Sequence, residues 1–153
     1  MILRYYSRTG NNRKIAEYLS GRLGCEAREI REAGRHEGGG NFMKAIFGTM
    51  FGFKPAIQEM PDEDQKAELL VLCTPVWAAQ VPGAVKTYLR TYQPAWTAFV
   101  SINQGNRNKR PRALGEPSLQ LKVPQGSGEI ENASAFSEDL DAFADEVLRR
   151  VGS

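Results

Sequence analysis

Residues 2–23 read ILRYYSRTGNNRKIAEYLSGRL, and this stretch decides the fold class. Residues 2–6 are aliphatic or aromatic apart from Arg4, and they predict a β-strand. Residues 12–23 predict a helix, because their apolar side chains recur at helical spacing and Gly24 is well placed to end it. A strand that leads through a short polar turn into an amphipathic helix is the start of a βαβ unit.

The rest of the chain continues this alternation. Further strands are predicted at residues 25–30, 69–74, 98–103 and 119–123, and the third is apolar throughout, as a strand covered on both faces should be. Helices are predicted at residues 41–53, at 82–92 and at 137–151, with Ser137 as the cap of the last one. Pro111 and Pro117 lie between the last two strands, so any helix there is short. We therefore expect one α/β domain over residues 1–153, with a parallel sheet.

Composition excludes several classes of protein. The 153 residues carry a net charge of +2 and 41% apolar side chains, which is ordinary for a globular chain. No apolar run approaches the roughly 18 residues of a membrane span, and the start does not read as a signal peptide, so we expect a cytoplasmic location. With only Cys25, Cys73 and His36, a zinc site or a histidine-based mechanism is disfavoured. The basic cluster at residues 107–112 lacks interleaved aromatic residues, so no nucleic-acid binding is expected.

The turn after the first strand is the first candidate site. In an open parallel sheet, ligands bind beyond the carboxyl ends of the strands, where the winding direction reverses. The hexad consists of Ser7, Arg8, Thr9, Gly10, Asn11 and Asn12 and leads directly into a helix. Hydroxyls, amides and free helix-start N–H groups suit a phosphate, although a simple helix cap explains the hexad equally well. Because neither GxxxxGK[ST] nor GxGxxG occurs, a mononucleotide is the better candidate than a nucleoside triphosphate or a tightly held dinucleotide.

Two further loops share the same edge of the predicted sheet. After the third strand, Trp77 offers a flat face on which a planar ligand could stack, although packing alone would also explain it. After the fourth strand, polar groups that could bind a ring edge come from Asn103, Gln104, Gly105 and Asn106. An anion-binding turn, a flat aromatic side chain and a set of polar groups at one edge of the sheet together favour a ligand in which a phosphate is joined to an aromatic ring system.

At these positions the chain resembles the flavodoxin family. The resemblance rests on residues 5–14, YYSRTGNNRK, and on residues 74–77, TPVW, followed by Pro82 and a helix containing Tyr88 and Leu89. It implies a doubly wound five-stranded parallel sheet of order 2-1-3-4-5, here with a shortened fourth helix, and FMN as cofactor. It further implies that the phosphate is held by Ser7, Thr9, Gly10, Asn11 and Asn12, with Arg8 as a compensating charge. The ring would be flanked by Trp77, by backbone of Pro75, Val76, Ala78 and Ala79, and on its pyrimidine side by Asn103, Gln104, Gly105 and Asn106.

The chain also departs from this family. Asn12 stands where a hydroxyl residue is common, Ala79 stands where many relatives have glycine, and the charge is slightly basic where electron carriers are acidic. Arg8 with the basic cluster at residues 107–112 could make the flavin end positive and favour acidic partners, or that cluster could be a solvated loop.

Three functions stay open. The first is electron transfer to a redox partner protein or small electron acceptor. The second is an NAD(P)H-dependent quinone or flavin reductase, and the third is a binding module that has lost its flavin. The apolar segment at residues 41–53 is a buried helix, a cap over the ligand or a subunit contact, so a homodimer is possible.

Overall fold

The computed structural model describes residues 1–34, 48, 51–77, 80–104, 114–123 and 128–152, without the side chains of residues 103 and 104. Its five strands are β1 (Ile2–Tyr5), β2 (Ala27–Glu29), β3 (Leu69–Pro75), β4 (Trp96–Gln104) and β5 (Ser118–Val123). They pair in parallel in the order β2-β1-β3-β4-β5. The predicted doubly wound α/β fold and its strand order are confirmed.

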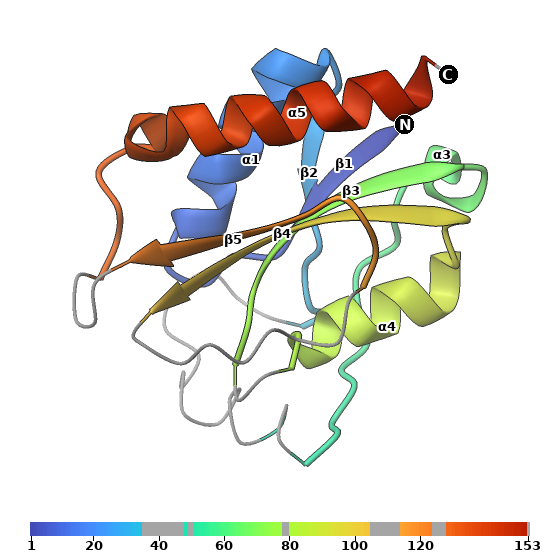
Figure 1. Ribbon diagram of the computed structural model, residues 1–153. Helices are drawn as coiled ribbons and strands as arrows, with labels where there is room; N and C mark the ends of the chain where they lie inside the picture. Colours follow the sequence, from blue (N-terminus) through green and yellow to red (C-terminus); the bar gives the residue numbers. More distant parts are fainter. Residues whose placement is uncertain (35–47, 49–50, 78–79, 105–113, 124–127, 153) are drawn as a thin grey trace.

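Helices cover both faces of this sheet (Figure 1). Helices α1 (Asn11–Leu23) and α5 (Ser137–Val151) lie side by side on one face, and α4 (Gly83–Tyr92) lies on the other. Successive residues of β3 therefore alternate between two cores: Val71 packs with the first pair of helices, whereas Leu70 and Leu72 pack with α4. This explains why β3 is buried from Leu69 through Thr74 and why its sequence shows no polar alternation.

Several element boundaries differ from the sequence prediction. β4 begins at Trp96, two residues before the predicted start, and β2 is only three residues long. Ser137 does not cap α5, because a 3-10 helix, η1 (Ala133–Phe136), leads directly into it and Asn132 caps that segment instead. Gly24 ends α1 in the left-handed conformation with φ 65°, as predicted. The predicted helix at residues 41–53 lies mostly outside the described residues, and its last part is wrong, because residues 51–53 are not helical. The predicted short fourth helix falls on residues that are largely outside the description.

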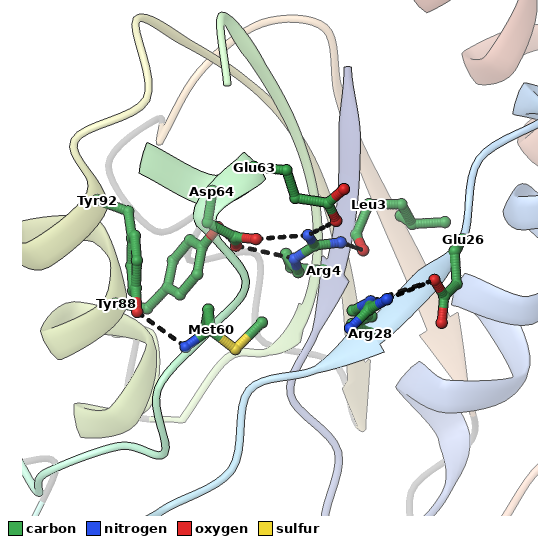
Figure 2. Close-up of polar contacts among 9 residues, drawn as sticks. All are labelled: Leu3, Arg4, Glu26, Arg28, Met60, Glu63, Asp64, Tyr88 and Tyr92. Atoms are coloured by element: carbon green, nitrogen blue, oxygen red, sulfur yellow. Dashed lines mark hydrogen bonds and ion pairs between the residues drawn. The ribbon is translucent and has the colours of Figure 1, made fainter. Parts of the chain in front are cut away.

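A short helix missed by the sequence analysis, α3 (Asp62–Gln65), precedes β3. Its Asp64 accepts a hydrogen bond from Arg4 of β1, and the hydroxyl of Tyr88 on α4 donates a hydrogen bond to the same carboxylate (Figure 2). Nearby, the backbone N–H of Met60 donates to the hydroxyl of Tyr92. These contacts fix α4 and the segment before β3 against the central strands. In the described part of the chain, no helix is both long and apolar enough to cross a membrane.

Candidate functional site

The three predicted loops begin at one edge of the sheet. β1, β3 and β4 are neighbours and run in parallel, so their carboxyl ends at Tyr5, Pro75 and Gln104 point the same way. The first two loops touch, because the guanidinium carbon of Arg8 lies 5.9 Å from the centre of the Trp77 ring. Of the third loop, only the backbone of Asn103 and Gln104 is described, at the end of β4. Gly105 and Asn106 lie outside the described residues, as do Ala78 and Ala79 in the second loop and the basic cluster at residues 107–112.

The turn between β1 and α1 holds two buried polar side-chain atoms, one from Ser7 and one from Asn12. Among the described residues, neither the hydroxyl oxygen of Ser7 nor the amide oxygen of Asn12 has a hydrogen-bond partner, although both side chains are buried. Buried polar atoms are nearly always paired in proteins, so these two side chains are suited to binding a ligand in the turn. The Ser7 hydroxyl can donate to an anion, and the Asn12 amide can do so through its NH₂ group after a half-turn.

The start of α1 supports the same interpretation. Gly10 precedes the helix with φ 86°, in the left-handed region that favours glycine, and no cap hydrogen bond from a side chain is present at this start among the described residues. Its first N–H groups therefore face the loop, where the positive end of the helix dipole attracts an anion. Ser7, Asn12 and the helix start together fit a phosphate group, whereas Thr9 is exposed at the rim.

Asn11, the remaining amide of the hexad, uses its side chain elsewhere. It donates a hydrogen bond to the backbone oxygen of Gly128 at 3.1 Å and accepts one from the backbone N–H of Ile130 at 2.8 Å. Its side chain thus fastens the segment between β5 and η1 to the first turn of α1. Any contact of Asn11 with a phosphate would have to come from its backbone.

Lys14 strengthens this attachment and brings a carboxylate to the loop. Its ammonium donates to the backbone oxygen of Ile130 at 2.7 Å and pairs with Glu129 at 2.9 Å, and the bond to Lys14 lowers the pKa of Glu129. A Cβ built on Gly10 would lie 2.7 Å from a carboxylate oxygen of Glu129, so that side chain rests directly on the loop. The sequence analysis missed this ion pair, because nothing in the local pattern links positions more than one hundred residues apart.

The Arg8 side chain turns toward Trp77. Its Nε donates to the hydroxyl of Tyr6 at 3.1 Å, and its Nη2 pairs with Glu32 at 3.4 Å. The Tyr6 hydroxyl in turn donates to the same carboxylate at 2.5 Å. Burial, and then this hydrogen bond, raises the pKa of Tyr6 to about 12, so its proton stays in place at neutral pH. The charge of Arg8 is therefore balanced within the protein by Glu32.

Trp77 lies just beyond β3 and is half-buried. Pro75 is the last residue of β3 and pairs with Ile102, while Val76 packs against the core beneath α4. The backbone of Trp77 exchanges two hydrogen bonds with Gln80, of 2.8 and 2.9 Å. The loop is therefore closed at its base, and the indole stands at the sheet edge beside the Ser7 to Asn12 turn.

The fold and these loops define a flavodoxin-like protein, and comparison of the sequence with known families agrees. Residues 5–98 match the model of the family described as NADPH-dependent FMN reductase, so the chain belongs to this family. Membership confirms the predicted flavodoxin-like, FMN-binding family and FMN as its cofactor. The matched residues include both the Ser7 to Asn12 turn and Trp77. A search of curated protein sequences found no match.

Solved structures resemble the chain over nearly its whole length. A protein from Bacteroides eggerthii DSM 20697 that is assigned as a flavoprotein superposes with a TM-score of 0.63 at 13% identity, covering 94% of this chain and 96% of the other. A flavoprotein from Lactobacillus acidophilus NCFM, crystallised in complex with FMN, gives a TM-score of 0.58 at 17% identity, covering 90% and 95%. At such low identity, these likenesses establish the fold alone.

Proposed function

We propose that the chain is an FMN-dependent oxidoreductase that takes electrons from NAD(P)H and passes them to a small acceptor such as a quinone or a free flavin. The observation that carries this proposal is the family match over residues 5–98, which spans a turn with an unpaired buried Ser7 hydroxyl. Electron transfer between proteins was the first function expected from the sequence. It stays a prediction, and the family match favours the reductase.

In this proposal the protein binds and orients the cofactor, while bound FMN supplies the redox chemistry. Ser7, Thr9, Gly10, Asn12 and the first N–H groups of α1 would hold the phosphate, and Trp77 would flank the ring. Backbone of residues 75–79 and the loop at residues 103–106 would border the remaining ring edges. This phosphate assignment is supported by the Ser7 hydroxyl, which can donate, and by the Asn12 amide, which can donate through its NH₂ group; neither side-chain oxygen has a partner among the described residues.

Charge supports the reductase over the carrier. The net charge is +2, whereas flavodoxins that act as carriers are strongly acidic, which favours their encounter with positively charged redox partners. A reductase that exchanges electrons with small molecules needs no such charge. A cytoplasmic location and a homodimer stay predictions.

Anaerobic mixing of the FMN-loaded protein with NADPH, and separately with NADH, tests the proposal. We expect direct loss of the oxidised flavin absorbance within the mixing experiment, followed by its return when a quinone is added. The control is the same amount of free FMN without protein. If the bound flavin is bleached only after a reductase protein is added, the chain is a carrier. If the purified protein binds no FMN, it is a flavodoxin-fold module without a cofactor.

A further inference from the structure

Arg8 follows Ser7 in the proposed phosphate turn, and its side chain reaches Tyr6, Glu32 and Trp77. Its guanidinium contacts the Tyr6 hydroxyl and the Glu32 carboxylate, and it lies over the indole of Trp77. Only about a tenth of the Arg8 side chain is exposed, as is about a fifth of Glu32. The ion pair is therefore shielded from water and holds its geometry better than a surface pair would.

The other end of this contact chain is fixed by backbone pairing. Glu32 forms an antiparallel bridge with Ile57, and the flanking residues are hydrogen bonded on both sides: Ala33 N–H to Ala56 at 2.8 Å, and Gln58 N–H to Arg31 at 2.8 Å. The backbone N–H of Tyr6 is likewise bonded to the oxygen of Cys73 in β3 at 3.0 Å. Tyr6 and Glu32 are thus rigid points from which Arg8 can be held.

Trp77 is restrained by the same group of residues. The Tyr6 ring meets the indole edge-on, with centroids 6.0 Å apart and planes at 75°. The Arg8 guanidinium lies over the same ring, at a distance where a cation attracts an aromatic face. Together the two side chains limit how far the indole can rotate or tilt.

We propose that Arg8 and Tyr6, anchored by Glu32, are positioning residues that hold Trp77 ready to stack on the flavin ring, so that Arg8 serves the ring end of the cofactor and not its phosphate. This inference rests on the proposed FMN site. It replaces the role expected for Arg8 from the family resemblance, which was to balance the phosphate charge.

FMN and riboflavin separate the two roles, because riboflavin has the ring without the phosphate. Calorimetric titration with both ligands is carried out on the wild-type protein, Arg8→Met and Arg8→Lys. We expect Arg8→Met to weaken both flavins by the same factor, roughly two- to fivefold. Arg8→Lys keeps the charge but loses the planar fork, so it should not restore binding. Trp77→Ala alone should weaken the binding of both flavins by about fivefold or more. Adding Arg8→Met to this variant should weaken binding little further, because the indole that Arg8 positions is gone.

Loss of FMN affinity alone in Arg8→Met, with recovery in Arg8→Lys, would overturn the inference and return Arg8 to the phosphate. The matched control is Arg28→Met, which removes the exposed ion pair between Arg28 on β2 and Glu26 (Figure 2) and should leave both affinities unchanged.

A second measurement needs no flavin. In a Trp96→Phe background, which leaves Trp77 as the single tryptophan, acrylamide, an uncharged quencher, should quench the indole more strongly after Arg8→Met or Glu32→Gln than after Arg28→Met. Equal quenching in all three variants would contradict the positioning role. If the wild-type protein binds neither flavin, the proposed function is contradicted. The quenching measurement would still test whether Arg8 contacts and positions Trp77, because it needs no flavin.

Discussion

Arg4 and Asp64 form a two-point ion pair inside the protein. Nε of Arg4 lies 2.8 Å from Oδ1 of Asp64 and Nη2 lies 2.5 Å from Oδ2, and both side chains are at most 1% exposed. The pair joins the central strand β1 to α3. The hydroxyl of Tyr88 on α4 donates a hydrogen bond of 2.5 Å to Oδ1 of Asp64, so α4 is joined to the pair as well (Figure 2). A charge that loses its partner in such a place is costly, whereas a pair replaced as a whole by apolar residues often is not.

We therefore expect Arg4→Met to lower the free energy of unfolding by about 3–5 kcal/mol, because it leaves the Asp64 carboxylate buried without its cation. Arg4→Met combined with Asp64→Leu should recover most of this loss. Urea denaturation measures both. Glu63→Gln is the control, since that carboxylate also contacts Arg4 but is about half exposed, and its loss should cost at most about 1 kcal/mol. A double variant no more stable than Arg4→Met would contradict this account.

Ser7→Ala should separate ligand affinity from stability. The Ser7 hydroxyl is buried and unpaired in the described chain, so its removal should leave the free energy of unfolding of the flavin-free protein unchanged or slightly higher. If the hydroxyl donates to the FMN phosphate, the same change should weaken FMN by about 1.5–3 kcal/mol and leave riboflavin unaffected.

Ser20→Ala is the matched control for that prediction. Its hydroxyl donates to the backbone oxygen of Cys25 at 2.7 Å, at the far end of α1. It should cost about 1 kcal/mol of stability without changing flavin affinity. An equal loss of FMN and riboflavin binding in Ser7→Ala would show that the hydroxyl does not meet the phosphate.

Lys14 and Glu129 place opposite charges beside the same turn, and their removal should act in opposite directions. Glu129→Gln removes an anion that rests on Gly10, so FMN should bind more tightly. Lys14→Met leaves that anion without its cation, and FMN should bind more weakly. Each change should be roughly two- to fivefold, because exposed charges interact weakly, and added salt should shrink both. Riboflavin affinity is the internal control, and a shift of equal size for riboflavin would place this ion pair away from the phosphate.

Most of the fold could be predicted from the sequence, because the burial of an element determines the spacing of its apolar residues. The apolar run from Leu69 to Cys73 and the spacing of Leu140, Phe143, Ala144 and Val147 on α5 each reflect one face of the packed structure. The short α3 was missed, because four acidic and amide residues at 62–65 show no periodicity.

The loops of the site could be found in the sequence, but not the contacts within them. Parallel strands place successive loops at one edge, so the positions of Ser7 and Trp77 follow from topology alone. Spacing says nothing about where a long side chain points. The sequence therefore did not show that the Arg8 guanidinium contacts Tyr6 and Glu32 and lies over the Trp77 ring. The sequence also did not show that Arg4 is buried, because its partner Asp64 lies sixty positions away.

Tyr6 should make the protein sensitive to alkaline pH. Its pKa is raised from 10.0 to about 12 in the folded state, first by burial and then by the hydrogen bond to Glu32. A raised pKa means that the folded state holds the proton more tightly than the unfolded state does. The resulting stability is fully present below pH 10 and is lost as the pH rises through 12. A shift of this size corresponds to roughly 2–3 kcal/mol.

Tyr6→Phe cannot ionise and should lack this loss. We expect the difference in unfolding free energy between wild type and Tyr6→Phe to be constant below pH 10. It should then fall by roughly 2–3 kcal/mol as the pH approaches 12 and passes it. Because the pKa values of Tyr5, Tyr18 and Tyr88 are also raised and these residues are common to both proteins, their contributions cancel in the difference. Denaturant titrations at several pH values measure it, and a difference that stays flat across this range would mean that folding does not raise the pKa of Tyr6.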